Sequence, residues 1–380
     1  MRRFFTLPKS IFFISISFLF FSCSANKTED LNQSWLADPE ASRETRALLL
    51  NLKTISDNGI LFGHQDDLAY GVMWKEEEGR SDVMEVSGAY PALFGWDLSK
   101  LGQRSFNIDT VDFDRMKKWI IQAYDMGGVN TISWHLDNPV SGGSSWDKTP
   151  AVYAILPGGD KHDWYKEKLD LFANFLSDLK SGPTAVPIIF RPFHEHTGNW
   201  FWWGRGNCTS EEYNALWKFT VEYLREVKDI HQLLYCYSTD RFKNREDYLE
   251  FYPGDKYVDI IAYDDYHSIK TLDTKDELIR QLREIVSIAD EKGKVAALSE
   301  TGYETIPDDD WWTTVFLEGL KSDSQASKIA YVMIWRNAWP HHHYVPYPGH
   351  PSAEDFIEFK KDPFTIFLDE IPSNLYEWTE

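Results

Sequence analysis

The amino-acid sequence predicts a single eight-stranded α/β barrel, the (β/α)8 or TIM barrel. Three observations support this fold class: short apolar runs recur along the chain, amphipathic helical stretches lie between them, and polar or aromatic residues gather where the runs end. The runs are apolar throughout rather than alternating, which is typical of strands buried on both faces of a parallel sheet. Strand and helix alternate along the chain, as in a barrel built from βα units.

Eight apolar runs are predicted to be the barrel strands. His, Asp, Glu or Trp residues stand at the ends of six or more of them. The runs, in chain order, are ILFGH (60–64), PALFGWD (91–97), VNTISWH (129–135), VPIIFRPFHE (186–195), LLYCYS (233–238), VDIIAYDDYH (258–267), VAALSE (295–300) and IAYVMIW (329–335).

Four helices are predicted from apolar residues at helical spacing and from clear end signals. Glycine after the last periodic residue is a common helix terminator, and a Thr followed three residues later by Glu is a capping-box pattern. The predicted helices cover 112–126, ended by Gly127-Gly128; 161–180, ended by Ser181-Gly182-Pro183; 209–227, opened by Thr209 and Glu212; and 275–292, ended by Gly293.

A doubly wound open sheet is the alternative fold for this pattern. An open sheet concentrates its ligand-binding residues at one switch point, whereas here they follow most of the strands, which favours the barrel. No GxGxxG or P-loop follows any strand, and no linker divides the chain. We therefore predict one catalytic domain over residues 41–380, with a functional role for the long loop 136–160, because loops of that length are usually functional.

The N-terminus is predicted to be a lipoprotein signal peptide over residues 1–23. Arg2 and Arg3 precede the apolar run IFFISISFLFF, which is shorter than the roughly 20 residues of a transmembrane helix, and Ser22-Cys23 follows. The segment that ends at Cys23 resembles a lipobox, although Phe20 and Phe21 stand where Leu and a small residue are usual. We expect lipid on Cys23, a flexible tether over 24–40, and an outer-membrane-attached lipoprotein; whether it faces the periplasm or the cell surface stays open.

The overall charge argues against nucleic acid as a partner. Lys and Arg number 39 against 60 Asp and Glu, and the net charge of −21 repels nucleic acid and anionic lipid. Neutral ligands fit better, and the 16 Trp residues offer flat apolar surfaces of the kind that sugar rings can cover. We expect a monomer whose only membrane contact is the lipid. Cys208 and Cys236 can form a disulfide or remain two unpaired thiols.

Two carboxylates, Glu195 and Glu300, end the fourth and seventh predicted strands. In a barrel these ends share one mouth, so the two side chains can face each other across a substrate. Opposed carboxyl groups are the minimum equipment for cleaving a glycosidic bond, because one protonates the leaving oxygen and the other attacks the anomeric carbon. The segment RPFHEHTGNWFWWG around Glu195 adds aromatic side chains that can support a sugar chain.

Five segments together carry a resemblance to a known family, namely RPFHEHTGNWFWWG, LSETGYE, GHQDD, SWHLDNP and YVMIWRNA. They resemble glycoside hydrolase family 26, whose best-known members are endo-β-1,4-mannanases. The resemblance covers about residues 40 to 370. It implies a clan A barrel without a cofactor that hydrolyses β-mannan with retention, with Glu195 as general acid/base and Glu300 as nucleophile. Alternatives are a β-1,3-xylanase, a mixed-linkage β-glucanase, or a non-catalytic sugar-binding lipoprotein.

The same resemblance implies seven substrate-binding or supporting residues. His194 would bond the sugar next to the scissile bond, and His135 would be a subsite histidine. A tyrosine would hydrogen-bond the nucleophile and fix its rotamer, and aromatic rings would line the cleft. By match these are His135, His194, Tyr263 as that tyrosine, Trp335 under the reacting sugar, and Trp164, Trp200 and Phe201 beside it; Trp202 and Trp203 are expected to be partly structural.

No metal site is predicted. The run His341-His342-His343 lacks a carboxylate at the helical spacing of HExxH, so we expect it to form a polar rim. Asp66-Asp67 and Asp264-Asp265 are not surrounded by calcium-loop spacing. We expect these carboxylates to be solvated or hydrogen-bonded in loops.

Overall fold

Eight parallel strands close into a barrel in the computed structural model, which describes residues 1–2, 36–372 and 374–378. The strands follow one another around the barrel in chain order, and the last pairs with the first from Leu61↔Tyr331 to His64↔Ile334. The predicted fold is confirmed, and the open-sheet alternative is wrong. The barrel strands are β1 (Ile60–Gln65), β4 (Leu93–Asp97), β5 (Val129–Ser133), β8 (Ile188–Arg191), β9 (Leu233–Thr239), β10 (Ile260–Asp265), β11 (Val295–Thr301) and β12 (Tyr331–Ile334).

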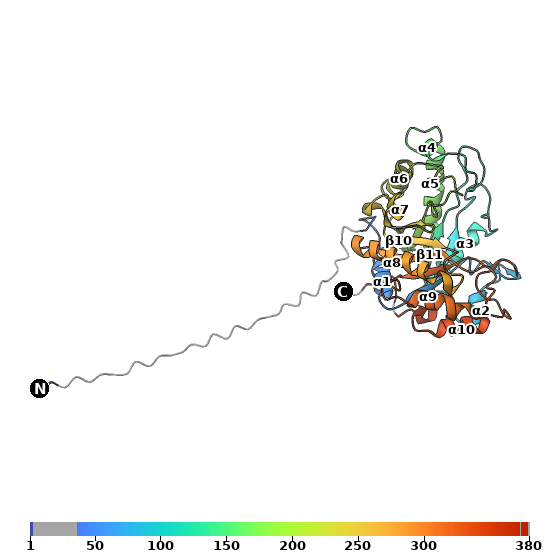
Figure 1. Cartoon of the computed structure of the whole chain (residues 1–380). Coiled ribbons are helices and arrows are strands. Elements are labelled where there is room, and N and C mark those ends of the chain that lie inside the picture. Colours follow the sequence, from blue (N-terminus) through green and yellow to red (C-terminus); the bar gives the residue numbers. More distant parts are fainter. Residues whose placement is uncertain (3–35, 373, 379–380) are drawn as a thin grey trace. The chain divides into compact units, whose positions relative to one another are not determined.

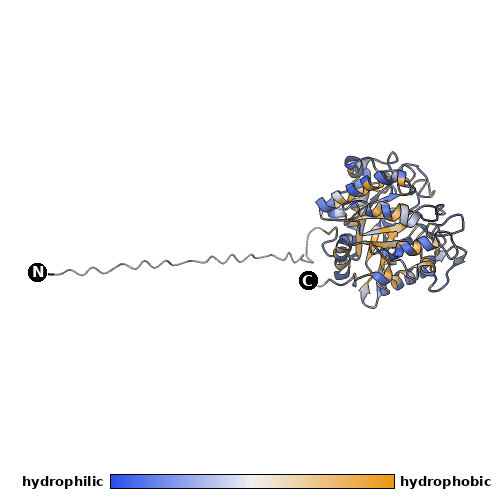
Figure 2. Cartoon of the chain, turned by 60° about the horizontal axis from the view of Figure 1, so that its bottom comes forward, coloured by the Kyte–Doolittle hydropathy of each residue, from blue (hydrophilic) through white to orange (hydrophobic). Residues whose placement is uncertain are grey.

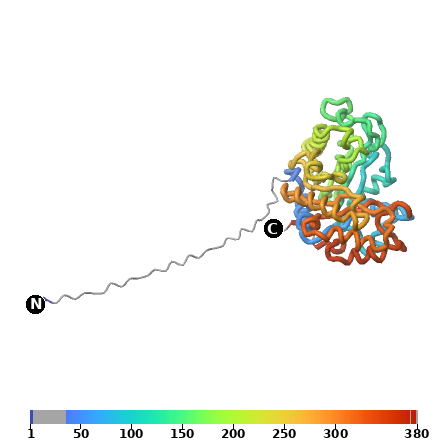
Figure 3. The backbone as a smooth tube through the Cα atoms, in the orientation of Figure 1, coloured from blue at the N-terminus to red at the C-terminus, as the bar shows by residue number. Residues whose placement is uncertain are grey.

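Five short strands lie outside this ring. β13 (Thr365–Ile366) pairs with the start of β1, and the other four form two small hairpins. In Figure 3 the blue start of the folded chain lies beside its red end, where the barrel closes. The hairpins are β2 (Tyr70–Gly71) with β3 (Trp74–Lys75), and β6 (Lys180–Ser181) with β7 (Thr184–Ala185).

Helices surround the strands (Figure 1). All four predicted helices are present, over 113–125, 162–178, 210–227 and 275–292, the third with a π-helical end. The other helices were not predicted, and the longest of these is Arg43–Ser56. The helical segments are α1 (Arg43–Ser56), α2 (Asp82–Ser87), α3 (Phe113–Asp125), α4 (Val152–Ile155), α5 (His162–Asp178), α6 (Ser210–Glu222), η1 (Tyr223–Val227), α7 (Arg245–Leu249), η2 (Asp255–Tyr257), η3 (Leu272–Thr274), α8 (Lys275–Lys292), η4 (Trp312–Leu317), α9 (Glu318–Lys321), α10 (Ala353–Lys361) and η5 (Leu368–Glu370).

Alternate residues of each strand pack into two separate apolar clusters. On β10, Ala262 belongs to the cluster inside the barrel, whereas Tyr263 belongs to the cluster between strands and helices. Successive side chains of a strand point to opposite faces, so both clusters come from continuously apolar runs. Figure 2 shows the strands as the apolar centre, with hydrophilic residues on the outer helical surfaces.

Helix α1 closes the N-terminal end of the barrel. Its residues Leu48, Leu49, Leu52 and Ile55 join the interior cluster together with Leu61 and other residues near the strand starts. Ser42 caps the helix by accepting a hydrogen bond from the Thr45 backbone. The opposite, C-terminal end of the barrel is left for the functional residues.

The folded domain begins before the predicted boundary at residue 41. The Ala37 N–H donates to Asp259 Oδ1 at 2.8 Å, and Asp38 is buried with its Oδ2 2.8 Å from His231 Nδ1. The predicted tether over 24–40 therefore extends too far. The predicted signal peptide and Cys23 lie outside the described residues. Among the residues that are described, no helix is both long and apolar enough to span a membrane.

The two remaining cysteines are free thiols. Cys236 is buried inside the barrel, with its Sγ 3.6 Å from the Tyr331 hydroxyl, whereas the Cys208 thiol donates to the Trp203 carbonyl at 3.3 Å. The disulfide alternative is therefore wrong.

Candidate active site

Both predicted catalytic glutamates line one cleft of about 300 Å³ at the C-terminal ends of the strands. Five of the seven predicted substrate-binding residues line it as well, namely His135, His194, Trp200, Phe201 and Trp335. Six further residues complete the lining, namely Trp146, Tyr266, Lys270, Gly302, Glu304 and Tyr344. Residues from widely separated parts of the chain thus meet at one site.

Glu195 lies in a tight turn just beyond β8. The predicted strand extended to residue 195, but β8 ends at Arg191, because Pro192 has no N–H to continue the ladder. Phe193 and Glu195 have left-handed φ values of 50° and 54°, each of which costs about 1–3 kcal/mol for a non-glycine residue. The Glu195 N–H donates to the Ser238 carbonyl at 3.0 Å, which ties the turn to β9.

The surroundings of Glu195 favour its protonated form. Burial raises the pKa of this carboxyl well above its usual range, and the negative charges of Glu300, Asp264 and Asp240 raise it further. The Trp200 indole N–H donates to Glu195 Oε2 at 2.7 Å and opposes this shift. A buried carboxyl that keeps its proton near neutral pH can serve as a general acid.

Glu300 is directed into the cleft by a β-bulge in β11. The pairing with β10 shifts from Tyr263↔Leu298 to Asp264↔Glu300, so one extra residue, Ser299, is inserted. A bulge interrupts the alternation of side chains, which lets Ser299 and Glu300 both face the barrel axis: Ser299 donates to Asp264, and Glu300 lines the cleft.

Two donors hold the Glu300 carboxylate. The Tyr266 hydroxyl donates to Oε1 at 2.7 Å, and the Arg191 guanidinium forms an ion pair with Oε2. Arg191 and Glu300 are both buried, so their charge-assisted hydrogen bond is poorly screened. These contacts fix the direction of the Glu300 carboxylate in the cleft.

Tyr266 occupies the position that the sequence assigned to Tyr263, and the Tyr263 prediction is wrong. The Tyr263 side chain points out of the barrel, where its ring packs against Phe242 with centroids 5.7 Å apart, and its hydroxyl has no hydrogen-bond partner among the described residues. β10 ends at Asp265, and Tyr266 just beyond it turns toward Glu300. Strand parity excludes Tyr263, because Ala262 and Asp264 occupy the interior side.

A buried network lies beneath Glu300. Asp264 Oδ2 accepts from Arg191 Nη1 at 2.8 Å, and its Oδ1 accepts from the hydroxyls of Ser238 at 3.0 Å and Ser299 at 2.7 Å. Arg191 therefore bridges two carboxylates, Asp264 and Glu300. The network fixes the guanidinium that orients Glu300.

Two histidines form one wall of the cleft in different protonation environments. Asp97 Oδ2 accepts from His135 Nδ1 at 2.8 Å. Although burial opposes it, the Asp97 carboxylate raises the pKa of His135 overall. Burial lowers the pKa of His194 well below its usual range, helped by the positive charges of Arg191 and His135, so His194 stays neutral beside Glu195. The His194 ring meets His135 edge-on, with centroids 4.7 Å apart.

Aromatic rings cover the remaining walls. Trp335 follows β12 at a position whose parity points inside the barrel, and the exposed Trp146 stacks on His135 at 5.2 Å. Phe201 stacks on the fully buried Trp203 at 4.6 Å. Trp202 and Trp203 donate their indole N–H groups to the carbonyls of Leu136 and His194. These last two tryptophans support the loop without touching the cleft.

Trp164 does not line the cleft, so its predicted role is not supported. It lies in the first turn of α5, where it packs against the outer apolar cluster, and Lys168 Nζ lies 5.4 Å from its ring centroid. Its helical position carries no strand-end signal, and the expectation rested on the family resemblance alone.

The sequence reasoning missed six lining residues, and four of them carried usable signals. Trp146 lies in the loop 136–160 that was predicted to be functional, Tyr266 lies in the segment YDDYH, and Gly302 and Glu304 lie in the segment LSETGYE. No pattern in the sequence marks Lys270 or Tyr344, because the folding of loops alone brings them to the cleft.

The histidine run is part of this loop layer rather than a cluster of metal ligands. His342 Nδ1 lies 2.7 Å from Glu304 Oε1, whereas His343 is buried and packs edge-on against His350, with centroids 4.9 Å apart. Across the described residues, no three His, Cys, Asp or Glu side chains come together as a possible metal site.

Known proteins share this architecture and much of the sequence. A relative from Bifidobacterium adolescentis, named mannan endo-1,4-beta-mannosidase, is 33% identical over 83% of this chain, which spans 33% of that relative. A β-mannanase structure from Bacteroides ovatus is 40% identical with a TM-score of 0.85, covering 89% of this chain and 98% of its own. A modular endo-β-1,4-mannanase structure from Cellulomonas fimi is 38% identical with a TM-score of 0.84, covering 91% and 80%.

The match to a family model covers most of the barrel. Residues 37–344 match the model described as glycosyl hydrolase family 26, a segment that includes both glutamates and every residue lining the cleft. The fold, the cleft and the relatives agree on the same assignment, and the chain belongs to glycosyl hydrolase family 26.

Proposed function

We propose that the protein is a retaining endo-β-1,4-mannanase that hydrolyses mannan, galactomannan or glucomannan by double displacement. The observation that carries the proposal is the unequal setting of two carboxyls in one cleft. Burial raises the pKa of Glu195, whereas Arg191 and Tyr266 hold the Glu300 carboxylate. Retaining glycosidases need one carboxyl of each kind.

In the first step, Glu300 attacks the anomeric carbon of the sugar over Trp335. Glu195 donates its proton to the leaving glycosidic oxygen, and a covalent glycosyl–enzyme intermediate forms with inverted configuration. In the second step, Glu195, now ionised, takes a proton from water, which attacks the same carbon and releases Glu300. Two inversions give net retention.

The choice of mannan rests on the relatives. Those from Bifidobacterium and Bacillus subtilis are named mannan endo-1,4-beta-mannosidases, and the Bacillus subtilis relative is matched over 89% of its length. The His135 and His194 edges offer hydrogen bonds to hydroxyl groups, and Trp146 and Trp335 offer flat surfaces.

We also propose that the mature protein is attached to the outer membrane through lipid on Cys23. The short apolar run followed by Ser22-Cys23 supports this proposal. Two acyl chains or more give stable anchoring without a transmembrane helix.

Product analysis tests the proposed activity. The protein should release reducing ends and oligosaccharides from linear mannan and mannohexaose, and far less from β-1,3-xylan or lichenan. If xylan or lichenan were cleaved preferentially, that polysaccharide and not mannan would be the substrate. Binding of mannan without any release of reducing sugar would instead indicate a non-catalytic sugar-binding protein.

A further inference from the structure

His196 is a buried histidine that directly follows Glu195, the proposed general acid. It does not line the cleft, and its side chain is fully enclosed. Its ring packs against Tyr213 of α6, Tyr237 of β9 and Phe251, with centroids 4.4, 4.8 and 5.5 Å away, all three in the outer apolar cluster. The side chains of Glu195 and His196 therefore leave the same turn in different directions, one into the cleft and the other into the layer between strands and helices.

Tyrosine hydroxyls contact both nitrogens of the His196 ring. Nδ1 lies 3.0 Å from the Tyr213 hydroxyl, and Nε2 lies 2.9 Å from the Tyr237 hydroxyl. The Tyr213 hydroxyl also lies 3.1 Å from the carbonyl oxygen of Phe193, in the turn itself. The Tyr237 hydroxyl lies 2.9 Å from the carbonyl oxygen of Tyr248. One imidazole thus joins the turn to α6 on one side and to β9 on the other.

The ring is neutral under ordinary conditions, because burial lowers the pKa of His196 to about 3. A neutral imidazole donates through one nitrogen and accepts through the other, so it can bond to both tyrosines. The tyrosine that donates to the ring gives up its bond to a backbone carbonyl, and three of the four contacts carry a proton. Since the ring is neutral and does not reach the cleft, it does not exchange a proton with the substrate.

The turn that carries Glu195 needs support, because its backbone is strained. Phe193 and Glu195 have left-handed φ values, and such residues persist only where the surrounding structure over-determines them. Each carbonyl from Phe193 to His196 is close to a donor. In chain order the donors are the Tyr213 hydroxyl, the Trp203 indole at 2.9 Å, the Gly198 N–H at 2.9 Å and the Arg205 N–H at 2.7 Å.

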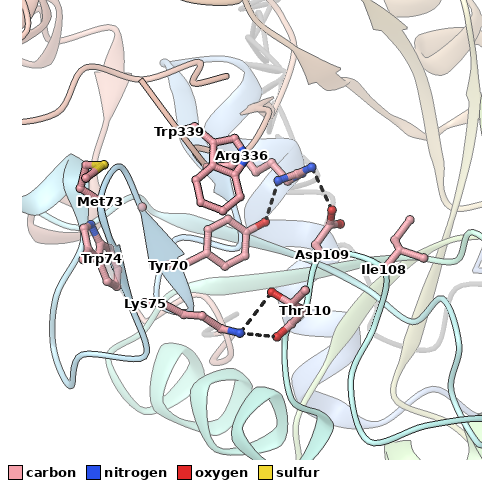
Figure 4. A pocket seen from close by; sticks show the side chains of 11 residues that line it. Tyr70, Met73, Trp74, Lys75, Ile108, Asp109, Thr110, Arg336 and Trp339 are labelled. Atoms are coloured by element: carbon pink, nitrogen blue, oxygen red, sulfur yellow. Dashed lines mark hydrogen bonds and ion pairs between the residues drawn. The ribbon is translucent and has the colours of Figure 1, made fainter. Parts of the chain in front are cut away.

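Another buried tyrosine of the molecule has a different role. Figure 4 shows the Tyr70 hydroxyl beside Arg336, whose Nη1 donates to it at 3.4 Å, and this hydroxyl donates to Asp66 at 2.7 Å. It joins side chains to one another. The two hydroxyls at His196 join an imidazole to backbone carbonyls instead, so this network fixes the main chain of the turn.

We propose that His196 is a positioning residue for Glu195, which holds the strained turn so that the carboxyl stays enclosed and directed at the leaving oxygen. The inference rests on the proposed glycosidase function and deepens it. Without this anchor the turn relaxes and the Glu195 carboxyl gains contact with water. Proton transfer to the leaving oxygen then weakens, and the pKa of Glu195 falls, because burial is the main cause of its elevation.

The test replaces His196 with Phe, which keeps a ring in the apolar layer and removes both tyrosine contacts. On linear mannan, whose leaving group needs a proton, His196→Phe should lower kcat/KM by roughly 10- to 100-fold, the loss expected when a reacting group is displaced by about 1 Å. On an aryl β-mannoside with an acidic phenol, kcat/KM should change by less than about 3-fold. Because Glu195 also activates water in the second step, kcat and KM for the aryl mannoside should fall together.

The pH profile gives a second readout. In His196→Phe the alkaline limb of kcat/KM on mannan should move to lower pH, as expected for a more hydrated carboxyl. Tyr165→Phe is the matched control, because Tyr165 is fully buried, its hydroxyl lies 2.6 Å from Thr220 Oγ1, and it does not line the cleft. This variant should keep the wild-type profile and the wild-type ratio of kcat/KM on the two substrates.

Two further variants separate positioning from folding. Tyr237→Phe keeps the imidazole and removes one of its contacts, so it should shift the ratio of the two kcat/KM values in the same direction by a smaller factor. His196→Gln keeps a donor and an acceptor and should recover part of the activity on mannan. Circular dichroism identifies the folded variants, and Tyr237→Phe decides the outcome if His196→Phe does not fold.

Two results would overturn the inference. One is an equal loss of kcat/KM on mannan and on the aryl mannoside, which would indicate a structural role alone. The other is an unchanged kcat/KM on mannan in folded His196→Phe, or an unchanged ratio in Tyr237→Phe. If the wild type cleaves neither substrate, the proposed function fails and the inference fails with it.

Discussion

At the scale of single residues, the site places two glutamates in different surroundings. Glu195 accepts one hydrogen bond, from Trp200, and is otherwise enclosed near other carboxyls, whereas Glu300 pairs with Arg191 and Tyr266. Burial without a cation disfavours the charged form, and a neighbouring cation favours it. The two side chains are chemically the same, but their surroundings differ.

Azide rescue separates the two roles. In Glu300→Ala, turnover of every mannoside should stop, because nothing attacks the anomeric carbon; added azide should then give the α-azide from an activated aryl mannoside by a single displacement. In Glu195→Ala, the aryl mannoside should still form the intermediate with a burst, while mannan hydrolysis collapses, and azide should give the β-azide. The anomers are identified by NMR. If both variants gave the same azide anomer, the roles assigned to Glu195 and Glu300 would be wrong.

The Trp200 hydrogen bond sets the pH range of the acid. The indole N–H stabilises ionised Glu195, so Trp200→Phe should raise the pKa of Glu195 further. Because the first step needs protonated Glu195, the alkaline limb of the kcat/KM profile on mannan should move to higher pH. The profile of Trp146→Phe, which lines the cleft without touching Glu195, is the control. A limb that moves to lower pH, or does not move, would contradict this role.

At the scale of elements, departures from regular strands direct Glu195 and Glu300 into the cleft. Pro192 ends β8 and allows the turn that carries Glu195, and the extra residue Ser299 in β11 turns Glu300 into the cleft. Bulges and strained residues cluster at functional sites. The turn after Pro192 and the bulge at Ser299 are local features. The directions in which they point Glu195 and Glu300 depend on the neighbouring strands.

Helix α1 should contribute strongly to the stability of the fold, because it closes the N-terminal end of the barrel. Leu52 is fully buried in the interior cluster, so Leu52→Ala should lower the free energy of unfolding by about 2–5 kcal/mol. Thr54→Ala on the exposed side of the same helix should change it by less than about 1 kcal/mol. Chemical denaturation measures both. If both substitutions changed the free energy of unfolding equally, the packing of α1 against the barrel interior would not be a main source of stability.

At the scale of the whole molecule, the barrel collects residues from across the sequence at one mouth. The lining of the cleft at that mouth comes from residues between His135 and Tyr344 in the sequence. The net charge of −21 leaves neutral polysaccharide as a better partner than anionic polymers.

Membrane attachment is the prediction that concerns the full chain. Cys23→Ala should move the protein from the membrane fraction to a soluble fraction, because acyl chains would supply the binding. Fractionation and labelling with a radioactive fatty acid measure the change, with Cys208→Ala as the control. Retention of Cys23→Ala in membranes would count against lipid attachment at this residue.

The barrel, its approximate strands and four of its helices, and the position of Glu195 and Glu300 at strand ends could be predicted from the sequence. These predictions follow from periodicity and from residues at strand ends, which are local properties. The folded chain was needed to show that Tyr266 rather than Tyr263 contacts Glu300, that Trp164 lies outside the cleft, and that α1 closes the barrel. Side-chain direction and loop contacts depend on strand parity, bulges and packing between distant segments, and no single stretch of sequence contains this information.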